Sequence, residues 1–135
     1  MKKKGNYWIL PCNSKKYNID KIFQDKEEIE WHQTNTNVEP GDIVYIYLTS
    51  PKQEVKYKCQ VVFSNKISND INDKEYCEDI DFSNYGKYMV LKKIKSYTTP
   101  KTFHELQEKG FKGIVRCIRY LDQNIVDFIE EEVNN

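Results

Sequence analysis

The chain has 135 residues, of which 39% are hydrophobic and 31% charged, a balance that fits one compact globular domain over residues 1–135. Its 21 basic and 21 acidic residues give zero formal net charge, which argues against a non-specific binder of phosphate backbones. The apolar run after the basic start is too short for a secretory signal or a membrane span, and four scattered cysteines without a CxxC pair argue against a zinc knuckle and indicate a reducing cytoplasm.

The first half of the chain predicts a strand, a short helix and a second, buried strand. Residues 6–12 favour a strand because four β-favouring side chains precede Pro11, and Asn18 can cap a short helix behind it. Polar residues 24–30 then lead to an isolated segment around Trp31. After a turn, residues 43–48 are almost wholly apolar, which is typical of a strand covered on both faces.

The second half begins with two predicted strands separated by an acidic stretch. Residues 55–63 alternate between apolar and basic side chains, so we expect a half-exposed strand whose outer face is basic. Residues 64–87 predict a solvated acidic loop, because they lack the regular oxygen spacing of a calcium site. Residues 88–97 predict a further strand interrupted by lysines.

Two helices and a β-like run complete the expected elements. Thr102 and Glu105 form a capping box for a helix that ends at Gly110, and residues 113–119 are β-like. Asp122 caps a last helix with an apolar stripe that extends to Val133. Strands outnumber helices without regular alternation, which excludes a doubly wound parallel sheet. We therefore predict an α+β fold, a curved sheet or small open barrel of about five to six strands flanked by short helices.

The motifs of catalysis and metal binding are missing from the sequence. The five glycines are dispersed, so no phosphate-binding loop is present, and His32 and His104 lack partners at metal-ligand spacing. Cys12 and His32 could meet in space, but a small buried thiol at a strand end is the ordinary explanation. We therefore expect no catalytic residues, no metal and no cofactor.

A segment centred on Trp31 is the best candidate for a binding site. An indole in a polar segment is either a core residue or a platform on which a flat ligand stacks. Gln33 and Asn35 beside it carry amides that can pair with the edge of a base. Flipped or single-stranded bases are commonly held between aromatic faces with polar groups at the rim.

These residues resemble the EVE domain of the PUA-like superfamily over nearly the whole chain. Residues 7–10, the Tyr17–Asp20 segment, Trp31 and residues 38–47 are similar to that family's motifs in order and spacing. Three segments of the second half look most like EVE-like domains found beside restriction-type nucleases. These segments are residues 85–89, 110–113 and 121–130.

The resemblance implies a pseudo-barrel with a pocket at its mouth, in a family whose relatives read methylated or otherwise modified bases in DNA and RNA. Trp31 would then be a stacking wall and Gln33 a polar contact beside it. Tyr47 and Thr49 would line the pocket from the end of their strand. A further pair, Cys12 and Asn13, stands on the same side of the pocket where the wider family carries Ser-Glu.

The predicted function is therefore a cytoplasmic module that captures a modified base of DNA or RNA, with a separately encoded nuclease as a possible partner. The expected phosphate contacts are basic residues of the strands and of the last third of the chain: Lys56, Lys58, Lys92, Lys93, Lys95, Arg116 and Arg119. Arg116 could instead remove a base-edge contact that nuclease-associated relatives make.

Two other functions stay open at this point. An ASCH-like nuclease or hydrolase of the same superfamily would need lysine, carboxylate or tyrosine side chains that converge in the pocket. A non-catalytic protein-interaction accessory domain would need neither such a set nor a base pocket.

Overall fold

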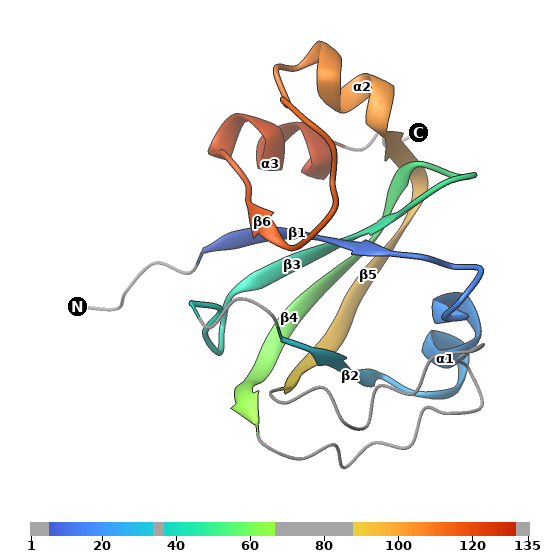
Figure 1. Ribbon diagram of the computed structural model, residues 1–135, viewed down its shortest axis with the longest axis vertical. Coiled ribbons are helices and arrows are strands. Elements are labelled where there is room, and N and C mark those ends of the chain that lie inside the picture. Colours follow the sequence, from blue (N-terminus) through green and yellow to red (C-terminus); the bar gives the residue numbers. More distant parts are fainter. Residues whose placement is uncertain (1–5, 34–36, 67–87, 132–135) are drawn as a thin grey trace.

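The computed structural model describes residues 6–33, 37–66 and 88–131, and Figure 1 shows how their elements are arranged. The elements in chain order are β1 (Tyr7–Cys12), α1 (Ile19–Asp25), β2 (Glu28–His32), β3 (Ile43–Leu48), β4 (Glu54–Lys66), β5 (Tyr88–Thr102), α2 (Phe103–Glu108), β6 (Arg119–Tyr120) and α3 (Gln123–Glu130).

The strands form a mixed six-stranded sheet in the order β2-β5-β4-β3-β1-β6. Strands β1 and β3 run parallel, and the other neighbours are antiparallel. The sheet is not closed into a barrel, since β2 and β6 end it as edges within the described residues. Helix α1 lies near β2 at one end of the sheet, whereas α2 and α3 lie together on the other side of β1 (Figure 1). The predicted α+β fold with a curved sheet is confirmed.

Two hydrophobic clusters cover the two faces of the sheet. The cluster that includes the apolar side chains of α1 is called the inner cluster here, and the cluster that includes those of α3 is called the outer cluster. Strand β3 contributes to both, because Val44 and Ile46 lie in the inner cluster while Tyr45 and Tyr47 lie in the outer one. The prediction that residues 43–48 form a strand covered on both faces is confirmed.

The predicted helix starts correspond to observed caps. The Asn18 side chain accepts a hydrogen bond from the backbone N–H of Lys21, at 3.1 Å. Thr102 and Glu105 form the full capping box, with each side chain accepting from the other residue's backbone N–H. Asp122 stands at the N-cap of α3 but makes no capping hydrogen bond through its side chain.

Two segments differ from their predicted structure. Residues 28–32 form a strand that the sequence did not predict, because this edge strand gains its hydrogen bonds from pairing with β5. Residues 113–118 are not a strand, and only Arg119–Tyr120 pairs with β1. The Arg119 guanidinium donates to the backbone carbonyl oxygens of Lys112 and Ile114, which holds this segment as a loop.

Strand β4 departs from the predicted alternation. Tyr57, Cys59 and Val61 lie in the inner cluster as expected. The pairing of β4 with β5 shifts between Val55 and Tyr57, so Val55 belongs to the outer cluster instead. Phe63, predicted to lie on the apolar face, is 58% exposed.

Some predictions fall on residues outside the described ranges, namely Asn35, most of the acidic stretch 64–87, and Val133. Residues 64–66 of that stretch continue β4. Among the helices of the described ranges, the sequence offers none with the length and apolar character needed to cross a membrane.

Candidate functional site

Trp31 lies on β2 with its ring partly buried against the inner cluster. The ring of Tyr17 meets it edge to face, with ring centroids 5.0 Å apart. Trp31 is therefore neither fully enclosed nor detached from the core, and both of its predicted roles stay compatible with its position.

Gln33 is buried at 4% exposure beside the end of β4. Its carbonyl oxygen accepts from the Asn65 backbone N–H at 2.6 Å, and its amide nitrogen donates to the Asn65 side chain at 3.4 Å. Both ends of the Gln33 amide thus hold Asn65, and the burial of Gln33 limits its access to a base.

The predicted pocket residues of the sheet fall into two groups. Thr49 donates from its backbone N–H to the Cys12 carbonyl oxygen at 3.0 Å, and exposed Asn13 follows Cys12 directly. These three lie together because β1 and β3 are parallel and end at the same edge. Tyr47 does not join them or Trp31: its ring lies in the outer cluster, where burial raises the pKa of its phenol.

The basic residues predicted to contact phosphate are dispersed over several surfaces. Lys58 pairs with Glu130 of α3, and Lys95 lies over the ring of Tyr97, with its Nζ 5.0 Å from the centroid. Lys92 and Arg116 are exposed, and Arg119 lies over the ring of Phe111 at 4.6 Å. Lys56 and Lys93, in contrast, line a common cleft.

That cleft, called the lysine cleft here, has a volume of about 430 Å³ and lies between α1, the turn before β4, and strands β4 and β5. Three lysines, a tyrosine and one carboxylate give it its chemistry. Its lining residues are Asp20, Phe23, Gln24, Lys52, Lys56, Tyr57, Lys93 and Ser96.

Neutral partners orient two of the three lysines. Lys56 donates to the carbonyl oxygen of Tyr97 at 3.2 Å, and Lys93 donates to that of Phe23 at 3.4 Å. A carbonyl positions an ammonium without cancelling its charge, and each ammonium has three N–H donors. Lys56 and Lys93 therefore keep their full positive charge and further donors toward the cleft.

The single carboxylate of the lysine cleft is shared between a phenol and a lysine. Tyr57 donates its hydroxyl hydrogen to Asp20, and the Lys52 ammonium lies 3.5 Å from the second Asp20 oxygen. Burial raises the pKa of the Tyr57 phenol well above its usual range, and the hydrogen bond to Asp20 raises it further. Tyr57 is thus a protonated hydrogen-bond donor at neutral pH.

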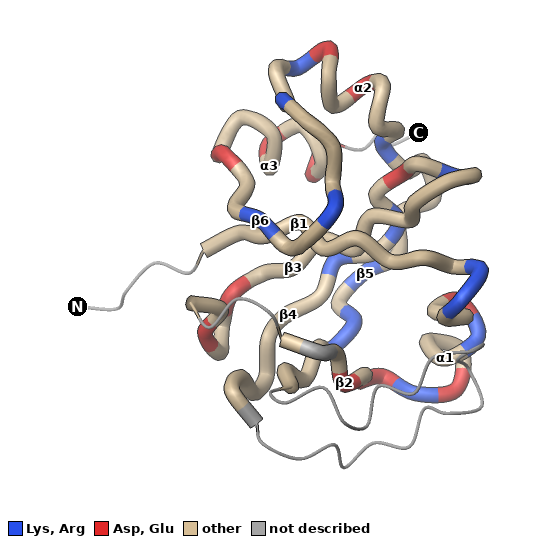
Figure 2. Tube along the Cα trace, in the orientation of Figure 1, with Lys and Arg blue, Asp and Glu red and all other residues tan. Residues whose placement is uncertain are grey.

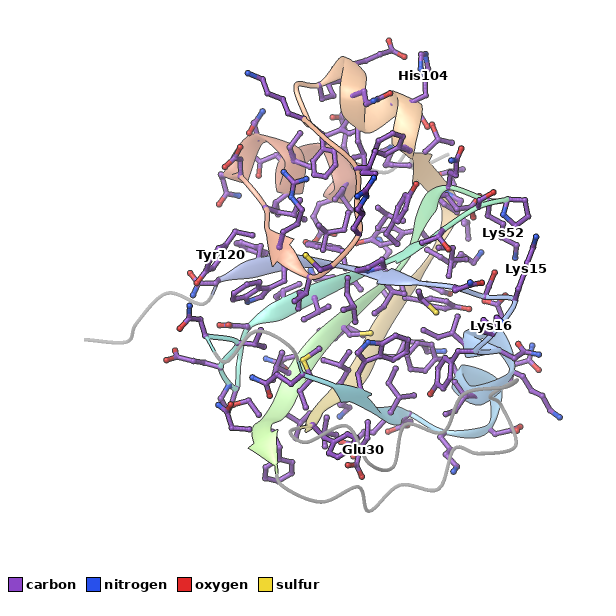
Figure 3. The ribbon with its side chains drawn as sticks, in the orientation of Figure 1. Lys15, Lys16, Glu30, Lys52, His104 and Tyr120 are labelled. Carbon is purple, nitrogen blue, oxygen red and sulfur yellow. The ribbon has the colours of Figure 1, made fainter. Side chains whose placement is uncertain are left out.

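The charge of the lysine cleft continues along one end of the molecule. Three lysines against one aspartate leave two positive charges in excess there. Lys15 and Lys16, in the turn between β1 and α1, lie on the same side of the molecule as Lys52 (Figure 3). Figure 2 shows further basic positions along β4 and β5. A chain without net charge therefore carries a local excess of positive charge at the lysine cleft.

Sequence reasoning identified Lys56 and Lys93 but missed Asp20, Lys52 and Tyr57. One signal was available: an inward-facing tyrosine in a basic strand needs a buried hydrogen-bond partner for its hydroxyl. Nothing in the sequence says that this partner comes from α1. Within residues 6–33, 37–66 and 88–131, no three His, Cys, Asp or Glu side chains gather as a metal site would require.

Solved structures of low sequence identity share this fold. A hypothetical protein from Leishmania major matches with a TM-score of 0.67 and 18% identity, over 93% of this chain and 92% of that chain. Protein Atu2648 from Agrobacterium tumefaciens matches with a TM-score of 0.66 and 11% identity, over 93% of this chain and 90% of that chain. The ASCH protein from Zymomonas mobilis matches with a TM-score of 0.60 and 11% identity, over 90% of this chain and 92% of that chain.

No protein-family model matches the sequence, and no curated protein matches it. The solved structures are too distant in sequence to assign an activity, so they bear on the fold alone. The finer resemblance to EVE domains stays a prediction. The chain shares its fold with the ASCH protein from Zymomonas mobilis.

Proposed function

We propose that this chain binds nucleic acid, holding backbone phosphates of a single-stranded segment in the lysine cleft and stacking one base on Trp31. The observation that carries the proposal is the convergence of Lys52, Lys56 and Lys93 on one cleft in a chain whose formal net charge is zero. Phosphate contacts dominate the affinity of most nucleic-acid binders, and a local surface supplies them without a global field.

The two parts of the proposed site lie on neighbouring elements. Trp31 pairs with Met89 in β5, and Lys93 lies four residues further along the same strand. At roughly 3.3 Å per residue this separation is about 13 Å, a distance that a short single strand spans with two or three nucleotides. A base on Trp31 and phosphates in the lysine cleft therefore fit one continuous ligand.

We propose that the stacked base carries a modification such as a methyl group. The support is the partial exposure of the Trp31 ring, whose position the edge of Tyr17 fixes. A fixed aromatic face recognises the shape and the added apolar surface of a flat ligand. Cys12, Asn13 and Thr49 supply the polar backbone and side-chain groups nearest to the end of β1.

The lysine cleft is tested by comparing Lys93→Gln with Lys92→Gln. These neighbours in β5 have the same charge, but only Lys93 lines the cleft. Anisotropy titrations of a labelled single strand at several salt concentrations should show weaker binding for Lys93→Gln. The slope of log K against log salt should fall in magnitude by about 0.7, the value for one lost single-strand phosphate contact. Equal losses for both variants would contradict the proposal.

The role of Trp31 is tested by measuring binding and folding on the same variant. Trp31→Ala should lose roughly 1–3 kcal/mol of binding free energy if the ring stacks on a base. If the ring is only a core residue, the loss should instead be about 3–5 kcal/mol of folding stability. Trp31→Phe, which keeps an aromatic face, serves as the control. Oligonucleotides with and without a methylated base then show whether the modification is read.

A second candidate function is hydrolysis of a phosphodiester. Lys52, Asp20 and Tyr57 supply the lysine, carboxylate and tyrosine set that an ASCH-like hydrolase needs. In such a reaction the lysines would stabilise the negative charge that develops on phosphorus-bound oxygens. Tyr57, whose one hydroxyl hydrogen is donated to Asp20, would orient that carboxylate. Incubation with single-stranded RNA and DNA tests this function. Turnover that Asp20→Asn abolishes while binding persists would establish it.

A further inference from the structure

The lysine cleft carries more positive charge than one backbone phosphate balances. Its lining includes three ammonium groups and one carboxylate, that of Asp20. A phosphate inside a strand is a diester with one negative charge, whereas a phosphate at the end of a strand is a monoester. Because its second pKa is about 6, a monoester has nearly two negative charges at neutral pH, and it offers three acceptor oxygens. An end phosphate therefore matches the charge of the cleft more closely than an internal phosphate does.

The strand residues of the cleft lie on the face of the sheet that α1 covers. Strand pairing places Lys93 opposite Cys59 and Ser96 opposite Tyr57. Cys59 and Tyr57 belong to the inner cluster, and residues directly opposite each other in an antiparallel pair present their side chains on the same face. Lys93 and Ser96 therefore lie on the face of α1, whose Phe23 is part of the same cluster.

A bulge in β4 adds a second strand lysine to this cleft. Neighbouring residues of a regular strand point to opposite faces, but Lys56 and Tyr57 both line the cleft. The pairing of β4 with β5 shifts between Val55 and Tyr57, which allows this arrangement. Lys56 is half-buried, and its ammonium donates to the carbonyl oxygen of Tyr97 at 3.2 Å. The bulge thus brings an oriented cation to the same site as Lys93.

Buried aromatic rings fix the position of Lys93, whereas Lys52 has room to turn. Phe23 and Tyr57 are both buried and pack edge to face, with ring centroids 4.9 Å apart. The Lys93 ammonium lies 5.6 Å from the Phe23 centroid and also donates to the Phe23 carbonyl oxygen. The Lys52 side chain is 47% exposed in the turn before β4. An anion that enters the cleft therefore meets two oriented ammonium groups and a third that can turn toward it.

We propose that the lysine cleft binds the terminal phosphate monoester of a single strand, with the following two or three nucleotides extending about 13 Å to Trp31. This inference rests on the proposed function and names the part of the strand that the cleft holds. Lys52, Lys56 and Lys93 each donate to one of the three terminal oxygens, whereas a diester has only two unesterified oxygens. Inorganic phosphate and mononucleotides carry the same group, but they do not reach Trp31, so a strand binds more tightly than either.

The test is a series of anisotropy titrations of the full chain with one single strand whose end group is varied. The 5′ end carries a hydroxyl, a phosphate monoester or a methyl-capped phosphate, with the label on the 3′ end, and a second series varies the 3′ end instead. The methyl cap keeps the phosphate but removes one charge. At one end, the monoester should bind about fivefold more tightly than the capped phosphate, the effect of one further charge about 4 Å from an ammonium in water. The end that shows this preference gives the direction of the bound strand.

Lys93→Gln and Lys92→Gln are the matched variants. Lys93→Gln leaves an excess of one positive charge, which a diester already balances, so the preference for the monoester should fall to about twofold or less. Lys92→Gln changes an exposed neighbour outside the cleft and should keep the preference. Lys52→Gln should also lower it. Because Lys52 is an exposed turn residue, this variant keeps the test decisive even if Lys93→Gln does not fold.

The inference is overturned if the monoester and the capped phosphate bind equally well at both ends, or if Lys92→Gln lowers the preference as much as Lys93→Gln does. Binding of the hydroxyl-ended strand that Lys93→Gln still weakens would then leave the proposed function standing. A failure of every strand to bind would contradict both. Inorganic phosphate or a mononucleotide that binds as tightly as the strand would identify a small anion as the ligand and overturn the assignment to a strand end.

Discussion

Two aspartates, one just before β3 and one in α1, each accept a hydrogen bond from an aromatic side chain, yet their surroundings differ. Asp42, just before β3, is 2% exposed and accepts from the Trp8 indole and from the backbone N–H groups of Asn6 and Glu39, at 2.9–3.0 Å. Asp20 has a side chain that is 39% exposed, and it accepts from Tyr57 and pairs with Lys52 inside an open cleft.

The comparison shows that burial and the number of hydrogen-bond donors distinguish a structural carboxylate from one that suits a ligand site. Asp42 accepts from three donors and is 2% exposed, so an incoming group would find little room beside it. Asp20 lies among cations that outnumber it, and its partner Lys52 has a side chain that is 47% exposed. A carboxylate that accepts from an aromatic side chain therefore stabilises the fold just before β3, whereas a similar carboxylate in α1 stays accessible to a ligand.

The largest loss of stability is expected when the buried carboxylate of Asp42 is removed. Asp42→Ala leaves three donors without their acceptor, and each buried unsatisfied group costs about 1–3 kcal/mol. We expect a loss of about 3–5 kcal/mol in the free energy of unfolding, measured by urea denaturation. Asp20→Ala is the matched control and should lose about 1 kcal/mol or less, since its side chain reaches water. Similar losses for both would remove the distinction.

Removing the aromatic donor should likewise lower the free energy of unfolding more at Trp8, the donor to Asp42, than at Tyr57, the donor to Asp20. Trp8→Phe removes an indole N–H from a buried carboxylate and leaves a void, so a loss of about 2–3 kcal/mol in unfolding free energy is expected. Tyr57→Phe removes only a hydroxyl from a carboxylate that retains Lys52, for which about 1 kcal/mol is expected. Thermal unfolding of both variants in one buffer checks the order.

The pH dependence of stability under alkaline conditions tests the pairing of Tyr57 with Asp20. An unfolded tyrosine loses its proton with a pKa near 10, whereas burial and Asp20 keep Tyr57 protonated to higher pH in the folded chain. Above pH 10 the folded state then binds one more proton than the unfolded state. The stabilisation that Tyr57 gives the folded state is therefore complete below about pH 10 and declines above it, by up to about 1.4 kcal/mol per pH unit. Tyr57→Phe should show a shallower decline, in urea denaturation at several alkaline pH values. An identical decline would mean that Tyr57 titrates as in the unfolded chain.

The smallest effect is expected on ligand affinity. Asp20→Asn removes the one negative charge of the lysine cleft and keeps a similar shape, so a single strand should bind more tightly, by up to about fivefold. The gain should fade as salt screens the charges. Anisotropy titrations at low and high salt measure it, with Asp25→Asn, an exposed aspartate outside the cleft, as the control. Weaker binding would assign Asp20 a direct ligand contact.

Local signals in the sequence were enough to predict much of the fold. The capping residues Asn18 and Thr102 and the apolar run 43–48 act within a few neighbours, so their structures follow from the residues themselves. The strand at residues 28–32 was missed because an edge strand takes its stability from a partner distant in the sequence. The β-like residues 113–118 form a loop instead, since the Arg119 guanidinium binds their backbone.

The candidate site was harder to predict because it depends on which distant residues meet. Lys56 and Lys93 were expected to contact phosphate, but so was Lys58, which the docking of α3 pairs with Glu130. Asp20 comes from a helix whose position over β4 and β5 no local pattern encodes. Tyr47 belongs to the outer cluster by the alternation of β3, so it does not share a pocket with Trp31.

The two tryptophans of the chain occupy unlike environments, and this gives the protein two distinct intrinsic fluorophores. Trp8 is sealed in the core, so its emission should lie to the blue and resist soluble quenchers. Trp31 is only partly covered, so its emission should lie further to the red and respond to iodide or acrylamide. A native spectrum that resolves into these two components would let one unlabelled sample report separately on the interior strand β1 and on the edge strand β2.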